Sequence, residues 1–188
     1  MEGLALKQLG EFDEKIAKNY RDFIRDKEIN PSSQMVLATL LEMAGDTEGA
    51  KDAYRRLLEV SPKFAAAAAN LARLMANDGN PRNLNEARNL AQTAKDLNPA
   101  NPTYADTLGW VHYLQGQYYI AALEFQQAIE KSPTTPQFHY HLALAFEGQD
   151  KKEEAINAVK KSIASSESFL DRDKAEALYK KLTGKNFK

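Results

Sequence analysis

The chain has 188 residues, of which 43% are hydrophobic and 27% are charged, so its length and composition fit one ordinary domain or a short array of repeats. Its 25 basic and 26 acidic residues leave a formal net charge of −1, which provides no overall field to attract nucleic acid or an anionic membrane surface. Cysteine is absent, which excludes disulfide bonds, thiolate metal sites and cysteine nucleophiles.

No segment has the pattern of a membrane span or of a targeting sequence. The longest apolar run, residues 64–69, is mostly alanine and is too short to cross a bilayer. Residues 1–10 lack the basic start and the continuous apolar stretch of a signal peptide. We therefore expect a soluble protein without direct membrane insertion.

Two kinds of residue that interrupt helices recur at a nearly constant interval. Five glycines are separated by 35, 34, 37 and 32 residues: Gly10, Gly45, Gly79, Gly116 and Gly148. Three prolines are separated by 37 and 34 residues: Pro62, Pro99 and Pro133. Glycine favours helix C-termini and proline cannot continue a helix, so we interpret both series as the ends of helices in a repeated unit.

In chain order, this period predicts one incomplete unit followed by four complete ones. Residues 1–30 contain only the tail of a first helix before an apolar stripe, so we expect a partial N-terminal repeat. From that partial repeat we infer that the chain is the C-terminal piece of a longer array. Complete units are expected at residues 31–64, 65–101, 102–135 and 136–167.

Two features distinguish the later part of the chain. The unit at residues 65–101 has three extra residues in the turn between its two helices, within residues 78–83. Residues 168–188 contain an amphipathic pattern with Leu170 and Leu178 on its apolar side. That pattern predicts a C-terminal capping helix, whose polar face would shield the last repeat from water.

The unit at residues 102–135 shows the repeat most completely. Apolar residues three or four apart give each of its two predicted helices a stripe, with Leu108 on the first and Phe125 on the second. Gly116 between them is a good helix stop. Small residues at Gly109 and Ala121 suit two helices that pack with little between their backbones.

The order and spacing of these residues resemble the tetratricopeptide repeat. The matching positions are Leu108-Gly109, Ala121, Phe125, Ala128 and Pro133. The resemblance implies an all-α fold in which about eleven helices stack as antiparallel pairs into a right-handed α–α superhelix. No stretch shows the sustained period-two alternation of a strand, which agrees with an all-α fold.

The sequence contains no residue set that predicts catalysis, a cofactor or a metal. His139 and His141 are two residues apart on a predicted helix, so they point in different directions and cannot bind one metal together. His112 falls where the other units have a large packing residue, which predicts a structural role. Carboxylates alternate with lysine and arginine on helix faces, as on a solvated surface, and the glycines are isolated. We therefore expect a protein that is not an enzyme.

The resemblance implies a concave surface lined by the first helix of each pair, and by register its exposed positions are candidate binding residues. Trp110 and the tyrosines are large amphipathic side chains that serve as anchors, although Trp110 alternatively packs against the next helix. Asn70 and Arg73 lie on one helical face and could hold a backbone or a carboxylate, or could form an exposed polar face. The candidates are Asn70, Arg73, Asn77, Asp106, Trp110, Tyr113, Tyr140 and His141.

Some tetratricopeptide co-chaperones hold an acidic chaperone tail with a clamp of cations and asparagines. Asn70 matches one clamp position, but Met35, Thr39, Thr103 and Thr107 occupy others. Without those cations a terminal carboxylate has no partner, so the residues argue against this ligand.

These observations predict a non-enzymatic scaffold that binds a peptide or partner protein in the concave groove. The alternative is a structural module that joins copies of itself or further repeats through its stacking ends. Residues 106–110 resemble the C-terminal repeats of large bacterial tetratricopeptide proteins, including lipoproteins of exopolysaccharide and exosortase systems. A full-length chain would then be cytoplasmic, and a fragment of a secreted or lipoprotein precursor would be periplasmic.

Overall fold

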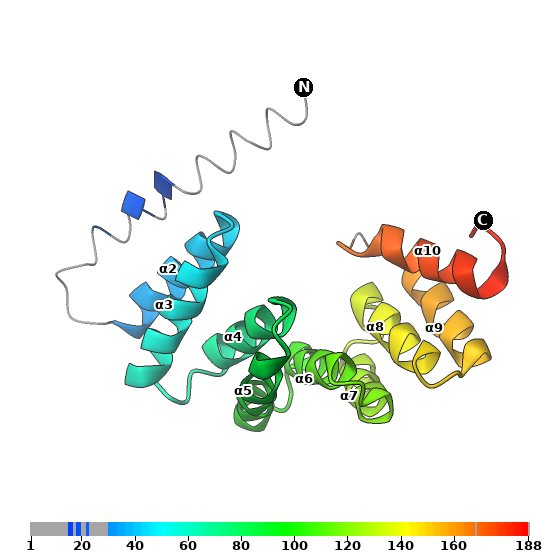
Figure 1. The fold of residues 1–188 in the computed structure, drawn as a ribbon, viewed down its shortest axis with the longest axis horizontal. Coiled ribbons are helices and arrows are strands. Elements are labelled where there is room, and N and C mark those ends of the chain that lie inside the picture. The colour runs from blue at the N-terminus through cyan, green and yellow to red at the C-terminus, as the bar shows by residue number, and fades with distance from the viewer. Residues whose placement is uncertain (1–14, 17, 20–21, 23–29, 168, 188) are drawn as a thin grey trace.

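The computed structural model describes residues 15, 16, 18, 19, 22, 30–167 and 169–187 (Figure 1). Within this described part every regular element is a helix, and no strand occurs. The helices are α2 (Pro31–Met43), α3 (Thr47–Val60), α4 (Ala65–Asn77), the short 3₁₀ helix η1 (Pro81–Asn83), α5 (Leu84–Leu97), α6 (Pro102–Leu114), α7 (Tyr118–Lys131), α8 (Pro136–Glu147), α9 (Lys152–Ala164) and α10 (Arg172–Thr183).

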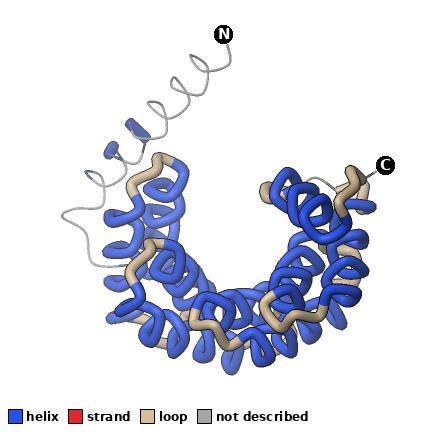
Figure 2. The backbone as a smooth tube through the Cα atoms, turned by 45° about the vertical axis from the view of Figure 1, so that its right-hand side comes forward, coloured by secondary structure: helices blue, strands red, loops and turns tan. Residues whose placement is uncertain are grey.

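The helices pack as successive pairs that follow an open arc (Figure 2). Each first helix packs on its own second helix, and each second helix packs on the first helix of the next pair. The first helices of neighbouring pairs also touch directly, α4 with α6 and α6 with α8. Figure 1 shows these first helices nearer the hollow of the arc than α5, α7 and α9. The predicted all-α superhelix of helix pairs is confirmed.

Side chains that precede the helices satisfy the free N–H groups of their first turns. Asn30 accepts from the N–H groups of Ser32 and Ser33, and Asn101 accepts from that of Thr103. A proline at the first position of α2, α6 and α8 leaves no donor to satisfy there. Asn30 and Asn101 are therefore the N-caps of α2 and α6.

The tight turns inside the pairs contain a residue with left-handed backbone. Its φ is +77° at Gly45, +75° at Gly79, +74° at Gly116 and +59° at Asp150. Gly148 directly follows the last residue of α8, as expected of a helix-ending glycine, but its φ is −62° and the left-handed residue follows two positions later. Gly148 also makes room for Tyr118, because a Cβ atom there would lie 2.6 Å from that ring.

The close helix approach predicted in the unit at residues 102–135 is present. A Cβ atom on Gly109 would lie 2.7 Å from the Phe125 ring and 3.0 Å from the Cβ atom of Glu124. Real side chains do not pack this tightly, so α6 and α7 require glycine at this position.

The longer turn after α4 is tied to α3 by Asp78. The Asp78 carboxylate accepts from the backbone N–H of Asn80 over 2.8 Å and from the Asn83 side chain over 2.6 Å. Lys51 is 4% exposed, and its ammonium lies 3.1 Å from the same carboxylate. Burial alone would raise the pKa of Asp78, but these hydrogen bonds and the Lys51 charge hold it below its usual range.

The last helix packs on α9 and buries Ala175 and Leu178 against the end of the array. Leu170 precedes α10 and is 98% exposed, so its predicted place in the apolar stripe is wrong. The partial repeat predicted over residues 1–30 lies almost wholly outside the described residues and stays a prediction. In the described part of the chain, no helix combines the length and hydrophobicity needed to cross a bilayer.

Candidate functional site

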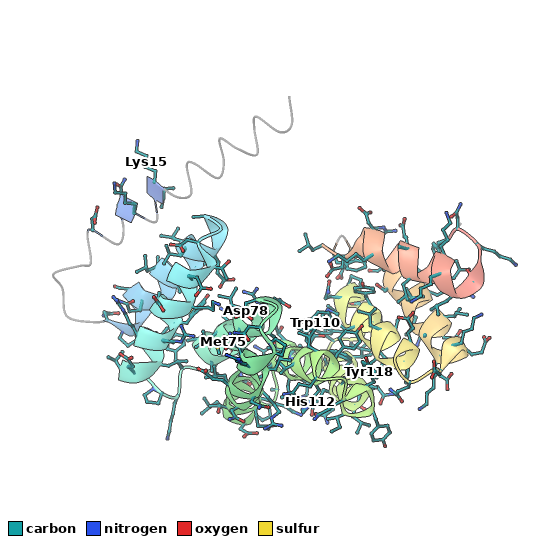
Figure 3. All side chains as sticks on the ribbon, in the orientation of Figure 1. Lys15, Met75, Asp78, Trp110, His112 and Tyr118 are labelled. Carbon is teal, nitrogen blue, oxygen red and sulfur yellow. The ribbon has the colours of Figure 1, made fainter. Side chains whose placement is uncertain are left out.

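We use the name inner face for the surface of α4, α6 and α8 that faces the hollow of the arc, where three aromatic rings stack. The Trp110 ring lies 5.2 Å from the Tyr113 ring with 18° between their planes, and 4.7 Å from the His141 ring with 25° between them. Trp110 and Tyr113 are three residues apart on α6 and both are half-buried. Figure 3 shows Trp110 on the side of α6 that faces the hollow and His112 on its other side.

His141 is held behind the Trp110 ring from two directions. Its Nδ1 atom lies 2.8 Å from Oδ1 of Asp106, and its Nε2 atom lies 2.7 Å from the side-chain nitrogen of Gln137. An amide nitrogen can only donate, so Nε2 accepts and Nδ1 donates to the carboxylate. His141 and Asp106 are each 8% exposed. Their predicted exposure in the groove is therefore wrong, because they satisfy each other between α6 and α8.

Trp110 also contacts the preceding pair. Its indole N–H donates to Oδ1 of Asn77 at the end of α4, over 2.8 Å. Asn77 is exposed, so this hydrogen bond lies at the surface of the inner face. The packing alternative for Trp110 is correct, because the ring stacks on His141 of α8. The ring is half-buried, and its role as an anchor for a ligand stays a prediction.

Asn70 and Arg73 are engaged within the molecule. Arg73 pairs with the Glu42 carboxylate of α2, and Asn70 donates to the Tyr54 hydroxyl over 3.0 Å. Tyr54 in turn donates to Glu42 over 2.5 Å. Burial and this bond to a carboxylate raise the pKa of Tyr54 to about 12. The network links α2, α3 and α4 and neutralises the Arg73 charge.

At the C-terminal end of the inner face, Gln137 of α8 takes part in a hydrogen-bond network that the sequence did not predict. Gln137 donates to Asp171 over 2.9 Å, and Lys174 lies 2.7 Å from the same carboxylate. Burial would raise the pKa of Asp171, but the hydrogen bonds from Lys174 and Gln137 lower it below its usual value. Asp171 belongs to the polar side of the amphipathic pattern at residues 168–188, and only its hydrogen bond to Gln137 of α8 shows that it joins this network.

Tyr140 is buried at this end rather than exposed. It is 6% exposed, and its ring lies 6.3 Å from the Phe169 ring that precedes α10. Burial and the nearby Asp171 carboxylate raise the pKa of Tyr140 to about 12. Its predicted exposure in the groove is wrong because the chain before α10 covers this part of α8. The contact of Asp106, Tyr140 and His141 with a ligand stays a prediction.

The charged side chains along this surface meet opposite charges or hydrogen-bond partners. Besides the pairs of Arg73, Asp106 and Asp171, the Glu147 carboxylate lies 2.6 Å from the Lys181 ammonium. None of these four charged side chains is unpaired. The inner face therefore offers a ligand the surface of the aromatic rings and the Asn77 amide.

The histidines have structural contacts. His139 hydrogen-bonds through Nε2 to the carbonyl of Pro133 over 2.7 Å, and half-buried His112 hydrogen-bonds to Gln117 over 2.6 Å. Among the described residues, no three His, Cys, Asp or Glu side chains come together in a way that could hold a metal ion.

Two protein-family models match the chain. One, for the tetratricopeptide repeat, covers residues 31–74, and the other, for subunit 3 of the anaphase-promoting complex or cyclosome, covers residues 80–162. No curated protein sequence matches the chain.

Several solved structures have the same fold at low sequence identity. A thermophilic tetratricopeptide protein of Thermus thermophilus aligns with a TM-score of 0.72 and 18% identity over 94% of both chains. MamA of Desulfovibrio magneticus RS-1, from residue 41 to its end, aligns with 0.71 and 15% over 84% of this chain and 91% of its own. A tetratricopeptide protein of Parabacteroides merdae ATCC 43184 aligns with 0.75 and 18% over 94% of this chain and 69% of its own.

The motif spacing, the arc of helix pairs and both kinds of comparison agree. They show that the chain is a member of the tetratricopeptide repeat proteins.

Proposed function

We propose that this chain is a non-enzymatic scaffold that binds a segment of a partner protein on its inner face, with Trp110 and Tyr113 as the anchoring side chains. Proteins built from tetratricopeptide repeats are generally protein-interaction scaffolds. The stacked rings support this assignment most strongly, because they are large, half-exposed and placed where the arc is hollow.

The rings are held before any ligand arrives. Trp110 is fixed by stacking on His141 and by its hydrogen bond to Asn77, and His141 is itself fixed by Asp106. A side chain that is already ordered loses little conformational entropy on binding, and a rigid aromatic surface is the usual chemistry of binding hot spots. The buried Asp106–His141 pair therefore serves the site by positioning Trp110.

The paired charges indicate the chemistry of the partner. Arg73 is neutralised by Glu42, so an acidic tail finds no unpaired cation there. We expect a segment with little charge that places an apolar or aromatic side chain on the Trp110 and Tyr113 rings. Its backbone can exchange hydrogen bonds with the exposed Asn77 amide.

The test is a selection of random peptides displayed on phage against the intact chain, followed by titration calorimetry with the selected peptides. Tyr113→Ala removes one anchor and should weaken the selected peptides about 10-fold or more, since one lost anchor costs at least about 1.4 kcal/mol. The matched control is Tyr119→Ala on α7, because Tyr119 is 65% exposed and takes no part in the stack.

Equal loss of affinity in both tyrosine variants, or none in either, would count against the inner face as the site. The alternative of self-assembly makes a different prediction. It requires the mass measured by light scattering to rise with protein concentration in the absence of any peptide.

A further inference from the structure

Helices α7 and α9 lie farther from the hollow of the arc than α6 and α8 (Figure 1). A second concave surface lies between α7 and α9, and we call it the α7–α9 cleft. Its floor is formed by His139, Leu142 and Phe146 of α8, and its volume is about 530 Å³. An adjoining cavity continues it toward the end of α9 and shares Ile129, His139 and Lys161 with it. The cleft shares no residue with the aromatic stack, so it is a separate surface.

The cleft is open because of the residues that face each other at this junction. At the α5–α7 junction the corresponding positions hold Lys95 and Glu124, whose charged atoms lie 2.5 Å apart and close the space. At the α3–α5 junction the corresponding positions hold Leu58 and Leu90, which both pack on the same buried cluster. These correspondences are counted from the buried alanine at the fourth position of each second helix, Ala50, Ala87, Ala121 and Ala155.

At the α7–α9 junction the two positions hold Ile129 and Ala158. A methyl group here replaces the leucine or glutamate side chain found at the other junctions. The cleft therefore has room at this junction for a leucine-sized side chain that the chain itself does not supply.

The rim of the cleft is acidic and its charges are unpaired. Glu130 of α7 and Glu154 of α9 are exposed on opposite walls, and neither forms an ion pair with a described residue. Lys161 is the cation among the lining residues. On the inner face, by contrast, the charged side chains have partners, as the contacts of Arg73, Asp106, Glu147 and Asp171 show.

We propose that the α7–α9 cleft is a second docking site, which binds a basic amphipathic helix of another protein. The helix inserts one leucine-sized side chain between Ile129 and Ala158, and its lysine or arginine residues one turn away lie against Glu130 and Glu154. The cleft is apolar between α7 and α9 and has one carboxylate on each wall. A basic amphipathic helix fits this arrangement, because its leucine and a basic residue three or four positions away lie on the same face. The scaffold then holds two partners on two different faces.

The test uses a synthetic alanine-based helical peptide with one leucine and an arginine four residues to either side. A matched peptide carries glutamate in place of both arginines. Each is titrated into the full chain labelled with ¹⁵N, and amide shifts report the affinity and the surface contacted. The expected shifts lie on α7 and α9, and the glutamate peptide should bind at least about 10-fold more weakly.

Two variants separate the contributions. Ala158→Leu supplies the missing side chain, as Leu90 does in α5, and should weaken the arginine peptide at least about 10-fold. Glu130→Gln with Glu154→Gln changes only exposed side chains, so the protein should fold normally and bind the peptide several-fold more weakly, with less dependence on salt. Tyr113→Ala should leave this affinity unchanged, which keeps the test independent of the inner face.

The proposal is wrong if both cleft variants bind the arginine peptide as the unaltered chain does. It is also wrong if the shifts fall on α4 and α6, or if the glutamate peptide binds equally well. A cleft occupied by a second copy of the chain would contradict it too, and would appear as a concentration-dependent mass that Ala158→Leu reduces.

Discussion

The indole N–H of Trp110 donates to Oδ1 of Asn77 over 2.8 Å and joins the first helices of two neighbouring pairs. The hydrogen bond spans 33 positions in the sequence, about one repeat. It therefore couples the main anchor of the proposed site to the packing of one repeat on the next.

Asn77→Ala should remove this coupling at low cost to the rest of the fold. The Trp110 N–H then loses its protein partner and bonds to water, so we expect a loss of about 0.5–1.5 kcal/mol in the free energy of unfolding. Trp110 is the single tryptophan of the sequence, so its fluorescence during urea unfolding measures the change. Asn89→Ala on the exposed surface of α5 is the control, and an equal change in both variants would show that the hydrogen bond contributes nothing.

The Lys51–Asp78 pair predicts sensitivity to acid. The pKa of Asp78 is lower in the folded state than in the unfolded chain, where it is about 3.9. The ionised carboxylate therefore contributes to the free energy of unfolding above a pH of about 3.9, and this contribution is lost as the pH falls toward the pKa of the folded state. Urea midpoints should therefore drop between pH 5 and pH 3. Asp78→Asn should be less stable than the unaltered chain at pH 7 and should lose less on acidification.

The control for this pair is Asp52→Asn, because the Asp52 side chain is 68% exposed and pairs with Arg55 on the surface of α3. If Asp52→Asn and Asp78→Asn change the pH dependence by the same amount, the buried pair is not its source.

Ser162→Ala should stabilise the protein. The Ser162 hydroxyl is fully buried in α9 and has no hydrogen-bond partner, whereas Ala94 and Ala128 occupy the corresponding positions of α5 and α7. Removing an unsatisfied buried hydroxyl should raise the free energy of unfolding by about 1 kcal/mol. Thermal unfolding followed by circular dichroism measures this, with exposed Ser166→Ala as the control. A lower melting temperature for Ser162→Ala would mean that the hydroxyl has a partner after all.

Tyr54 and Tyr140 should ionise later than ordinary tyrosines. Burial and a nearby carboxylate, Glu42 or Asp171, raise the pKa of each to about 12. The neutral hydroxyls therefore stabilise the fold fully below the unfolded value of about 10, and this contribution is lost as the pH rises through 12. Absorbance of tyrosinate between pH 9 and 12.5 tests this, and Tyr54→Phe should remove part of the late phase without changing the early one.

The sequence was sufficient for the helix pairs because their signals are local. Gly109 and Phe125, and the stripes three or four residues apart, specify how one helix meets the next within a unit. Gly148 ends α8 as expected, but the sequence could not show that it also makes room for Tyr118, because a glycine suits both a helix end and a close approach.

The inner face was predicted less completely. Helical register identifies which side of α6 and α8 faces the hollow, but it does not show what covers that side. Asp106 and His141 were expected to be exposed, and they are buried because each lies against the other helix. The α7–α9 cleft needed the structure as well, since it depends on which residue of α9 faces Ile129 of α7.

The most direct test of the proposed inner-face site is the fluorescence of Trp110 while a peptide selected against the intact chain is added. If the peptide covers the stacked rings, the emission should shift to shorter wavelength and quenching by acrylamide should fall, with the same midpoint as calorimetry. Unchanged emission and quenching at saturating peptide would show that the ligand binds elsewhere and would contradict the assignment of the inner face.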